Sequence, residues 1–120
     1  MTQLDNPNLE DMLQMGIRAA QRGDREGAQM QLQQVLDNNQ SNDRAWLYMA
    51  YIEPDSVKRI SYLQTALRYN PNNPTAKRAL ANINRQRKRK ERRVLEVGLV
   101  MIFGALSLGA VLVLVGLLLA

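Results

Sequence analysis

The chain has 120 residues, which is enough for one small domain. It contains no cysteine and no histidine, which excludes thiol nucleophiles, disulfides, histidine acid–base catalysis and most zinc or haem sites. The net charge of +5 comes entirely from residues 85–120, because residues 1–84 hold nine cationic and nine anionic side chains.

Residues 1–8 are polar and predict an N-terminal tail. They lack the basic and apolar regions of a signal peptide, so we expect the C-terminal segment to direct the chain to a membrane. Residues 9–84 predict an all-α domain of five helices, the first of them capped by Asn8. Apolar residues recur at helical spacing in this first helix, at Leu9, Met12, Leu13, Gly16, Ile17 and Ala20.

Polar breaks separate the predicted helices, and each break carries a residue suited to cap or start the next helix. These residues are Asp24, Asp43, Asp55 and Asn73, the last followed by Pro74 at the first helical position. Inward faces are predicted for the second helix (Ala28, Leu32, Val35, Leu36), the fourth (Val57, Ile60, Leu63, Ala66, Leu67) and the fifth (Ala76, Ala79, Leu80, Ile83).

The domain contains an internal repeat with an offset of 31 to 34 residues. The repeat resembles the tetratricopeptide (TPR) family at Gly16, Gly23-Asp24, Ala28, Leu32-x-x-Val35-Leu36, Trp46, Met49-Ala50, Ala66-Leu67 and Pro71. The sequence departs from the family pattern at Gln40, Glu53 and Arg59. The resemblance implies antiparallel helix pairs stacked into a short right-handed solenoid of about 2.5 repeats, capped by the fifth helix.

In this family the first helix of each repeat lines a groove. The resemblance therefore implies a peptide-binding groove lined by Leu13, Ile17, Leu47 and Tyr51, with Arg44 and Arg78 at its rim. Its occupant would be a peptide or a soluble protein. The alternative is that these residues form the core of so short an array. Trp46 is predicted to be an inter-helix core residue.

A basic segment follows the domain at residues 85–93, and its cations are Arg85, Arg87, Lys88, Arg89, Lys90, Arg92 and Arg93. Such a run alone would favour nucleic-acid binding. Its position directly before an apolar stretch favours membrane topology and contact with anionic lipid headgroups, and we expect no nucleic-acid partner. Two backbone alternatives remain, a helix continuous from residue 75 or a hinge at 85–93, and we favour the continuous helix.

Residues 94–120 predict a single transmembrane helix. From Val97 to Ala120 no side chain is charged, and these 24 residues would extend about 36 Å as a helix, against about 30 Å of hydrocarbon. The basic segment predicts a cytoplasmic N-terminal domain and a C-terminus at the opposite face of the cell inner membrane. This arrangement is tail-anchored.

Small residues form a line along the predicted span. Gly98, Ala105, Gly109 and Gly116 each fall within about 20° of one line along a helix, which favours close packing with another transmembrane helix. The alternative is that glycine is simply frequent in membrane helices, as Gly104 lies off this line.

We expect no catalytic residue, no cofactor and no metal, and hence no enzyme. We expect an accessory or scaffold subunit of a larger membrane complex, whose transmembrane helices are its partners. Residues 43–55 and 63–80 resemble short membrane-anchored TPR proteins of phototrophic bacteria, which implies a photosynthetic or respiratory electron-transfer complex. The alternative is a tail-anchored adaptor that recruits a soluble partner's peptide.

Overall fold

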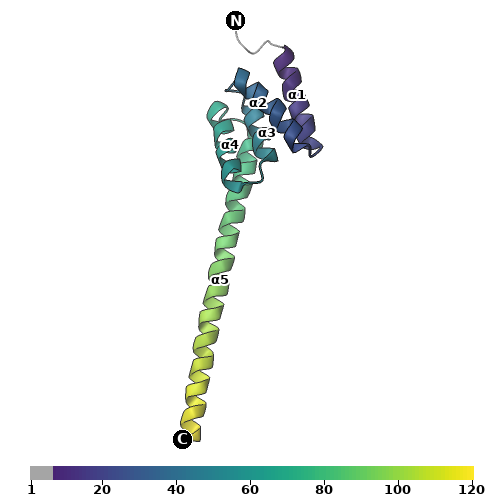
Figure 1. Ribbon diagram of the computed structural model, residues 1–120. Helices are drawn as coiled ribbons and strands as arrows, with labels where there is room; N and C mark the ends of the chain where they lie inside the picture. Colours follow the sequence, from purple (N-terminus) through teal and green to yellow (C-terminus); the bar gives the residue numbers. More distant parts are fainter. Residues whose placement is uncertain (1–6) are drawn as a thin grey trace. The chain divides into compact units, whose positions relative to one another are not determined.

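The computed structural model describes residues 7–120, and this part of the chain contains helices and no strand, as predicted (Figure 1). It divides into two compact units, Met1–Ile83 and Asn84–Ala120. The helices are α1 (Pro7–Gln21), α2 (Arg25–Asn38), α3 (Asp43–Ile52), α4 (Ser56–Tyr69) and α5 (Pro74–Leu119).

Helix α1 begins two residues earlier than predicted. Pro7 occupies its first position, where a missing N–H costs no hydrogen bond. Asn8 therefore lies in the first turn, and its predicted role as the N-cap is wrong. Residues 1–6 of the predicted tail lie outside the described residues.

The other predicted caps are confirmed. The side chain of Asp24 accepts a hydrogen bond from the Gly27 N–H at 3.0 Å, and that of Asp55 accepts from the Val57 N–H at 2.9 Å. Helix α3 starts at Asp43 as predicted, with Asn42 as its cap. These carboxylates and amides satisfy N–H groups that a helix leaves without partners in its first turn.

The α2–α3 and α4–α5 loops repeat the same backbone structure 31 residues apart. Asn39 and Asn70 follow the preceding helices with nearly equal angles, φ −142 and ψ 91 against φ −137 and ψ 91. Each donates its N–H to a carbonyl four residues earlier. Asn42 and Asn73 then accept a hydrogen bond from the N–H three residues later, at 3.0 Å in both loops. The sequence repeat therefore has a counterpart in hydrogen bonding.

The first core lies among α1, α2 and α3. Gly16 permits the close approach of α1 to α2, because a Cβ added there would lie 2.9 Å from Cδ2 of the fully buried Leu32. The buried members are Leu13, Ile17, Ala19, Ala20, Ala28, Leu32, Val35, Leu36, Ala45 and Met49. All four inward residues predicted for α2 belong to this core.

The second core joins α3 and α4 to the start of α5. Its buried members are Ala50, Leu63, Ala66 and Ala76, and the predicted α5 residues Ala79, Leu80 and Ile83 pack against them. Trp46 contacts both cores, and its Nε1 donates to the Gln40 carbonyl at 2.8 Å. The prediction of Trp46 as an inter-helix core residue is therefore confirmed.

Two residues of α4 differ from the sequence expectation. Val57 was predicted to face inward, but 70% of it is exposed. At about 100° per residue, Val57 lies roughly 120° around the helix from the buried Leu63, outside the buried face. Arg59, where the family has a small residue, donates from Nε and Nη2 to the Glu53 carbonyl at 3.0 and 2.7 Å and so closes the α3–α4 turn.

The second unit, Asn84–Ala120, is helical as far as Leu119. Helix α5 runs without a break through residues 85–93, so the favoured continuous-helix alternative is the one that the structure shows. Every residue from Asn84 onward is exposed.

Candidate functional site

The apolar part of α5 is the feature that differs most from an ordinary folded domain. Among the described residues, α5 is the one helix long and apolar enough to cross a membrane, and none of its most apolar stretch is buried. Large side chains such as Ile102, Phe103 and Leu112 are more than half exposed. Exposed apolar area on this scale is typical of a surface that another molecule or a lipid phase covers.

Four small residues of this stretch, Gly98, Ala105, Gly109 and Gly116, share one face of the helix, whereas Gly104 lies off that face. A Cβ added at Gly98, Gly109 or Gly116 would meet no atom within 4 Å. Gly16 differs, because there the added atom would collide with Leu32. The packing of this unit therefore does not require the glycines of the apolar stretch.

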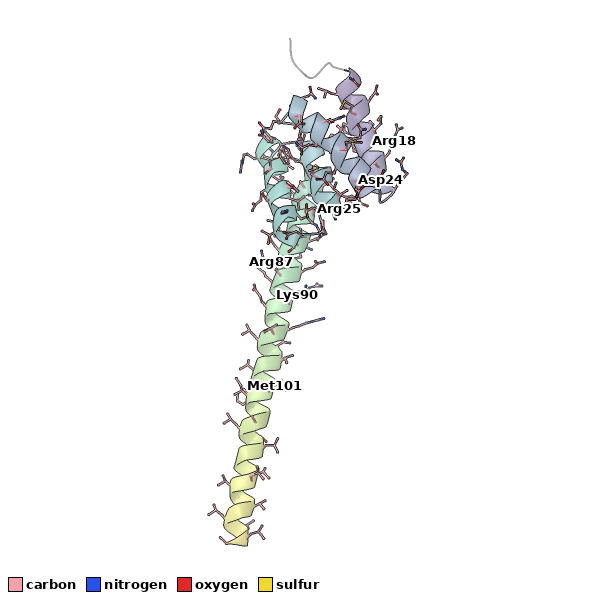
Figure 2. All side chains as sticks on the ribbon, in the orientation of Figure 1. Arg18, Asp24, Arg25, Arg87, Lys90 and Met101 are labelled. Carbon is pink, nitrogen blue, oxygen red and sulfur yellow. The ribbon has the colours of Figure 1, made fainter. Side chains whose placement is uncertain are left out.

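The basic segment is helical, and all seven of its cationic side chains are exposed. Figure 2 labels two of them, Arg87 and Lys90, on α5. In the part of the chain that the structure describes, the one salt bridge joins Arg44 to Glu10, so no cation of this segment is neutralised by an ion pair. The only anion within the segment is Glu91.

The residues predicted to line a groove do not form one surface. Leu13 is 1% exposed and Ile17 6% exposed, and both belong to the first core. A peptide cannot contact them in this structure, because α2 and α3 pack over this face of α1. Leu47 is half-buried against the second core. For Leu13 and Ile17 the structure supports the core alternative.

Arg44, predicted at the groove rim, connects α3 to α1. Its Nη1 lies 3.2 Å from Oε1 of Glu10, which also accepts a hydrogen bond from Gln14 Nε2 at 2.8 Å. The Gln14 hydrogen bond is the largest influence on Glu10 and lowers its pKa below the ordinary value. Burial opposes this shift, and the hydrogen bond and charge of Arg44 add smaller lowering effects.

Tyr51 and Arg78, the remaining predicted groove residues, are exposed. Tyr51 is 63% exposed, and its ring centroid lies 6.1 Å from that of Tyr48. Tyr51 also borders a shallow hollow of about 320 Å³ at the C-terminal ends of α1 and α3, which Ala20, Gln21, Gly23, Arg25 and Ile52 complete. Sequence reasoning identified Tyr51 but not this hollow, because the hollow depends on how the end of α3 packs beside the end of α1 and the start of α2.

A second hollow, of about 340 Å³, lies between α1 and α2. The exposed side chains of Met15 and Met30 border it together with Arg18, which Figure 2 labels. Met15 is absent from the apolar residues that define the predicted inward face of α1, so its exposure could have been inferred from the sequence.

No group of three carboxylate, histidine or cysteine side chains that could hold a metal occurs within residues 7–120. In the same range, every buried side-chain nitrogen or oxygen has a hydrogen-bond partner. The lack of catalytic, cofactor and metal sites stays a prediction.

No protein-family model, curated protein or solved structure matches the chain. The class of the protein is therefore defined by its own structure. Over residues 7–120 it is all-helical, with one helix long and apolar enough to span a membrane.

Proposed function

We propose that this protein is a non-catalytic, single-span subunit of a larger membrane protein complex. Its C-terminal helix packs against transmembrane helices of that complex, and its N-terminal domain stabilises or covers the cytoplasmic face. The observation that carries this proposal is the uncharged stretch 97–120 of α5, whose apolar side chains no described residue covers.

The orientation rests on the basic segment. Lysine and arginine concentrate on the cytoplasmic side of membrane spans, and all of the net charge of this chain directly precedes the apolar stretch. The N-terminal domain is therefore cytoplasmic in our proposal, and the C-terminus reaches the opposite face of the inner membrane.

The N-terminal domain is a TPR-like protein-interaction domain in this proposal. The equal hydrogen bonding of the α2–α3 and α4–α5 loops, 31 residues apart, supports a repeated helical unit. Repeat domains of this kind serve many partners, so the partner has to be argued from elsewhere in the chain. The resemblance to short anchored proteins of phototrophic bacteria makes an electron-transfer complex the first place to search.

The helix-packing face is the line Gly98, Ala105, Gly109 and Gly116. Small residues let two helices approach closely in lipid, where van der Waals contact drives association. The open space around the glycines supports this role, because no contact within their own unit requires a residue without a side chain at these positions.

The test compares two double variants in native membranes. Ala105→Leu with Gly109→Leu adds bulk to the packing face. Gly104→Leu with Ser107→Leu adds bulk about 120° or more around the helix from that face. After mild-detergent extraction, we expect the wild type and the second variant to co-purify with a complex much larger than the chain.

The first variant should lose that association by about tenfold or more, since close helix contact is blocked. Co-purification of both variants at wild-type levels would contradict the packing face. Migration of the wild type as a free chain would contradict membership of a complex.

A second candidate function is recruitment of a soluble partner, and the exposed Tyr51 beside its hollow favours it. In that case Tyr51→Ala would remove a soluble partner from the purified material and leave the membrane complex unchanged. A matched Tyr69→Ala variant changes another exposed tyrosine and serves as the control.

A further inference from the structure

The seven cations of residues 85–93 surround α5 on all sides, and we call this set the basic collar. At about 100° per residue, the widest gap between neighbouring cations is roughly 100°, from Arg87 to Lys88, and Glu91 lies within that gap. The collar extends over about 12 Å of helix. It therefore presents positive charge in nearly every direction.

This arrangement fits a bilayer surface better than other anionic partners. A nucleic acid or an acidic peptide approaches a helix from one side and would leave the cations on the other side without partners. Lipid headgroups surround a helix that enters a membrane, and they can contact cations on every side. Anionic headgroups attract basic segments next to a span, so phospholipids are the occupant that the geometry favours.

The cations of the basic collar lie at different distances from the start of the uncharged stretch, and hence from the membrane surface. The headgroup layer of one leaflet is roughly 5–7 Å thick. Arg93 and Arg92 lie about 6 to 8 Å before Val97, where the uncharged stretch begins, and Lys90 lies about 10 Å before it. Long cationic side chains can reach several ångströms toward the interface, so these three cations reach headgroup level. Arg85 lies about 18 Å before Val97, where salt screens its attraction to the surface.

We propose that the basic collar binds the anionic phospholipid headgroups of the leaflet next to it. Lys90, Arg92 and Arg93 make the direct contacts, while Arg85, Arg87 and Lys88 add a weaker, screened attraction. The protein thereby gathers anionic lipid around its span. This inference rests on the proposed function, because it requires α5 to cross a membrane.

The test uses the full chain reconstituted into vesicles of phosphatidylcholine with phosphatidylglycerol. Electron paramagnetic resonance of spin-labelled lipids measures how strongly each lipid is immobilised at the protein. Two variants each remove three charges: Lys90→Gln with Arg92→Gln and Arg93→Gln, and Arg85→Gln with Arg87→Gln and Lys88→Gln. Circular dichroism checks that each variant keeps its helix content.

We expect the wild type to prefer phosphatidylglycerol by about threefold or more at about 0.15 M salt, where charges are screened beyond about 8 Å, and this preference to vanish near 1 M salt. The variant changed at 90, 92 and 93 should lose most of the preference, whereas the variant changed at 85, 87 and 88 should keep most of it. Both variants have the same net charge, so a difference in their lipid preference reflects how far the removed cations lie from the membrane.

A wild type that is inserted but shows no lipid preference would overturn the inference, as would equal losses in the two variants. Tight binding of a single-stranded RNA oligonucleotide to the reconstituted protein, in place of the lipid preference, would also overturn it. Removal of the wild type from vesicles by alkaline carbonate would instead refute the proposed membrane span, so the two failures are distinguishable.

Discussion

The carboxylate of Asp43 links the start of α3 to the α4–α5 loop. Its Oδ2 accepts hydrogen bonds from Asn70 Nδ2 at 2.9 Å and from Asn73 Nδ2 at 2.8 Å. Asn73 is almost completely buried, so its amide cannot turn to water without disturbing the α5 cap that the same side chain forms.

Asp43→Ala should therefore lower the free energy of unfolding by about 1–3 kcal/mol, because it leaves a buried amide donor without a partner. Denaturant unfolding of the full chain in mild detergent, followed by Trp46 fluorescence, measures the change. Asp37→Ala is the control, since Asp37 is exposed and accepts from Gln33 within one helix. Equal, small effects of the two substitutions would show that the link contributes little.

Ionisation of Glu10 makes the stability of the N-terminal domain depend slightly on pH. Its pKa is lowered in the folded chain, first by the Gln14 hydrogen bond and then by Arg44. The stabilisation is therefore present above the ordinary glutamate pKa and is lost as the pH falls through the lowered value. Because the side chains of Glu10 and Arg44 are both about half exposed, we expect this stabilisation to be about 0.5 kcal/mol or less.

The comparison is between the wild type and Glu10→Gln, unfolded at several pH values from 3 to 7. The stability advantage of the wild type should grow as the pH rises past the glutamate range and then level off. An advantage that grows toward low pH would contradict the assigned sign. High salt should reduce the part of the advantage that comes from Arg44.

At the level of elements, the face of α4 that packs into the core can be tested directly. Leu63 is 1% exposed, while Val57, six residues earlier on the same helix, is mostly exposed. Leu63→Ala should lower the free energy of unfolding by about 2–5 kcal/mol because it leaves a cavity in the second core. Val57→Ala should change it by about 0.5 kcal/mol or less. A large loss of unfolding free energy in Val57→Ala would instead support the inward position that the sequence pattern predicted for Val57.

The helices and most of their caps could be predicted because their causes are local. Asp24, Asp55 and Asn73 cap helices through hydrogen bonds to N–H groups two or three residues away. The start of α1 was missed by two residues, since Pro7 and Asn8 are both compatible with a first turn.

The candidate surface could be predicted less well because it depends on packing between helices. The repeat pattern places Leu13 and Ile17 on one face of α1, but it does not show that α2 and α3 cover that face. The hydrogen bonds of Arg59 to the Glu53 carbonyl were missed for the same reason, as they depend on the path of the α3–α4 turn. The apolar stretch of α5 was readily found, since length and composition alone define it.

At the scale of the whole molecule, the central claim is that α5 crosses the membrane once and leaves the N-terminal domain in the cytoplasm. The chain contains no cysteine, so one introduced cysteine is a unique site for a membrane-impermeant maleimide. Ser61→Cys places this site on an exposed position of α4, and Ala120→Cys places it at the last residue.

The decisive measurement is labelling of these two variants in intact cells and in permeabilised cells, on chains that alkaline carbonate does not extract. Our account predicts that the cysteine at position 120 is labelled in intact cells and that the cysteine at position 61 is labelled only after permeabilisation. Labelling of both positions from the same side of the membrane, or release of the chain by carbonate, would contradict it.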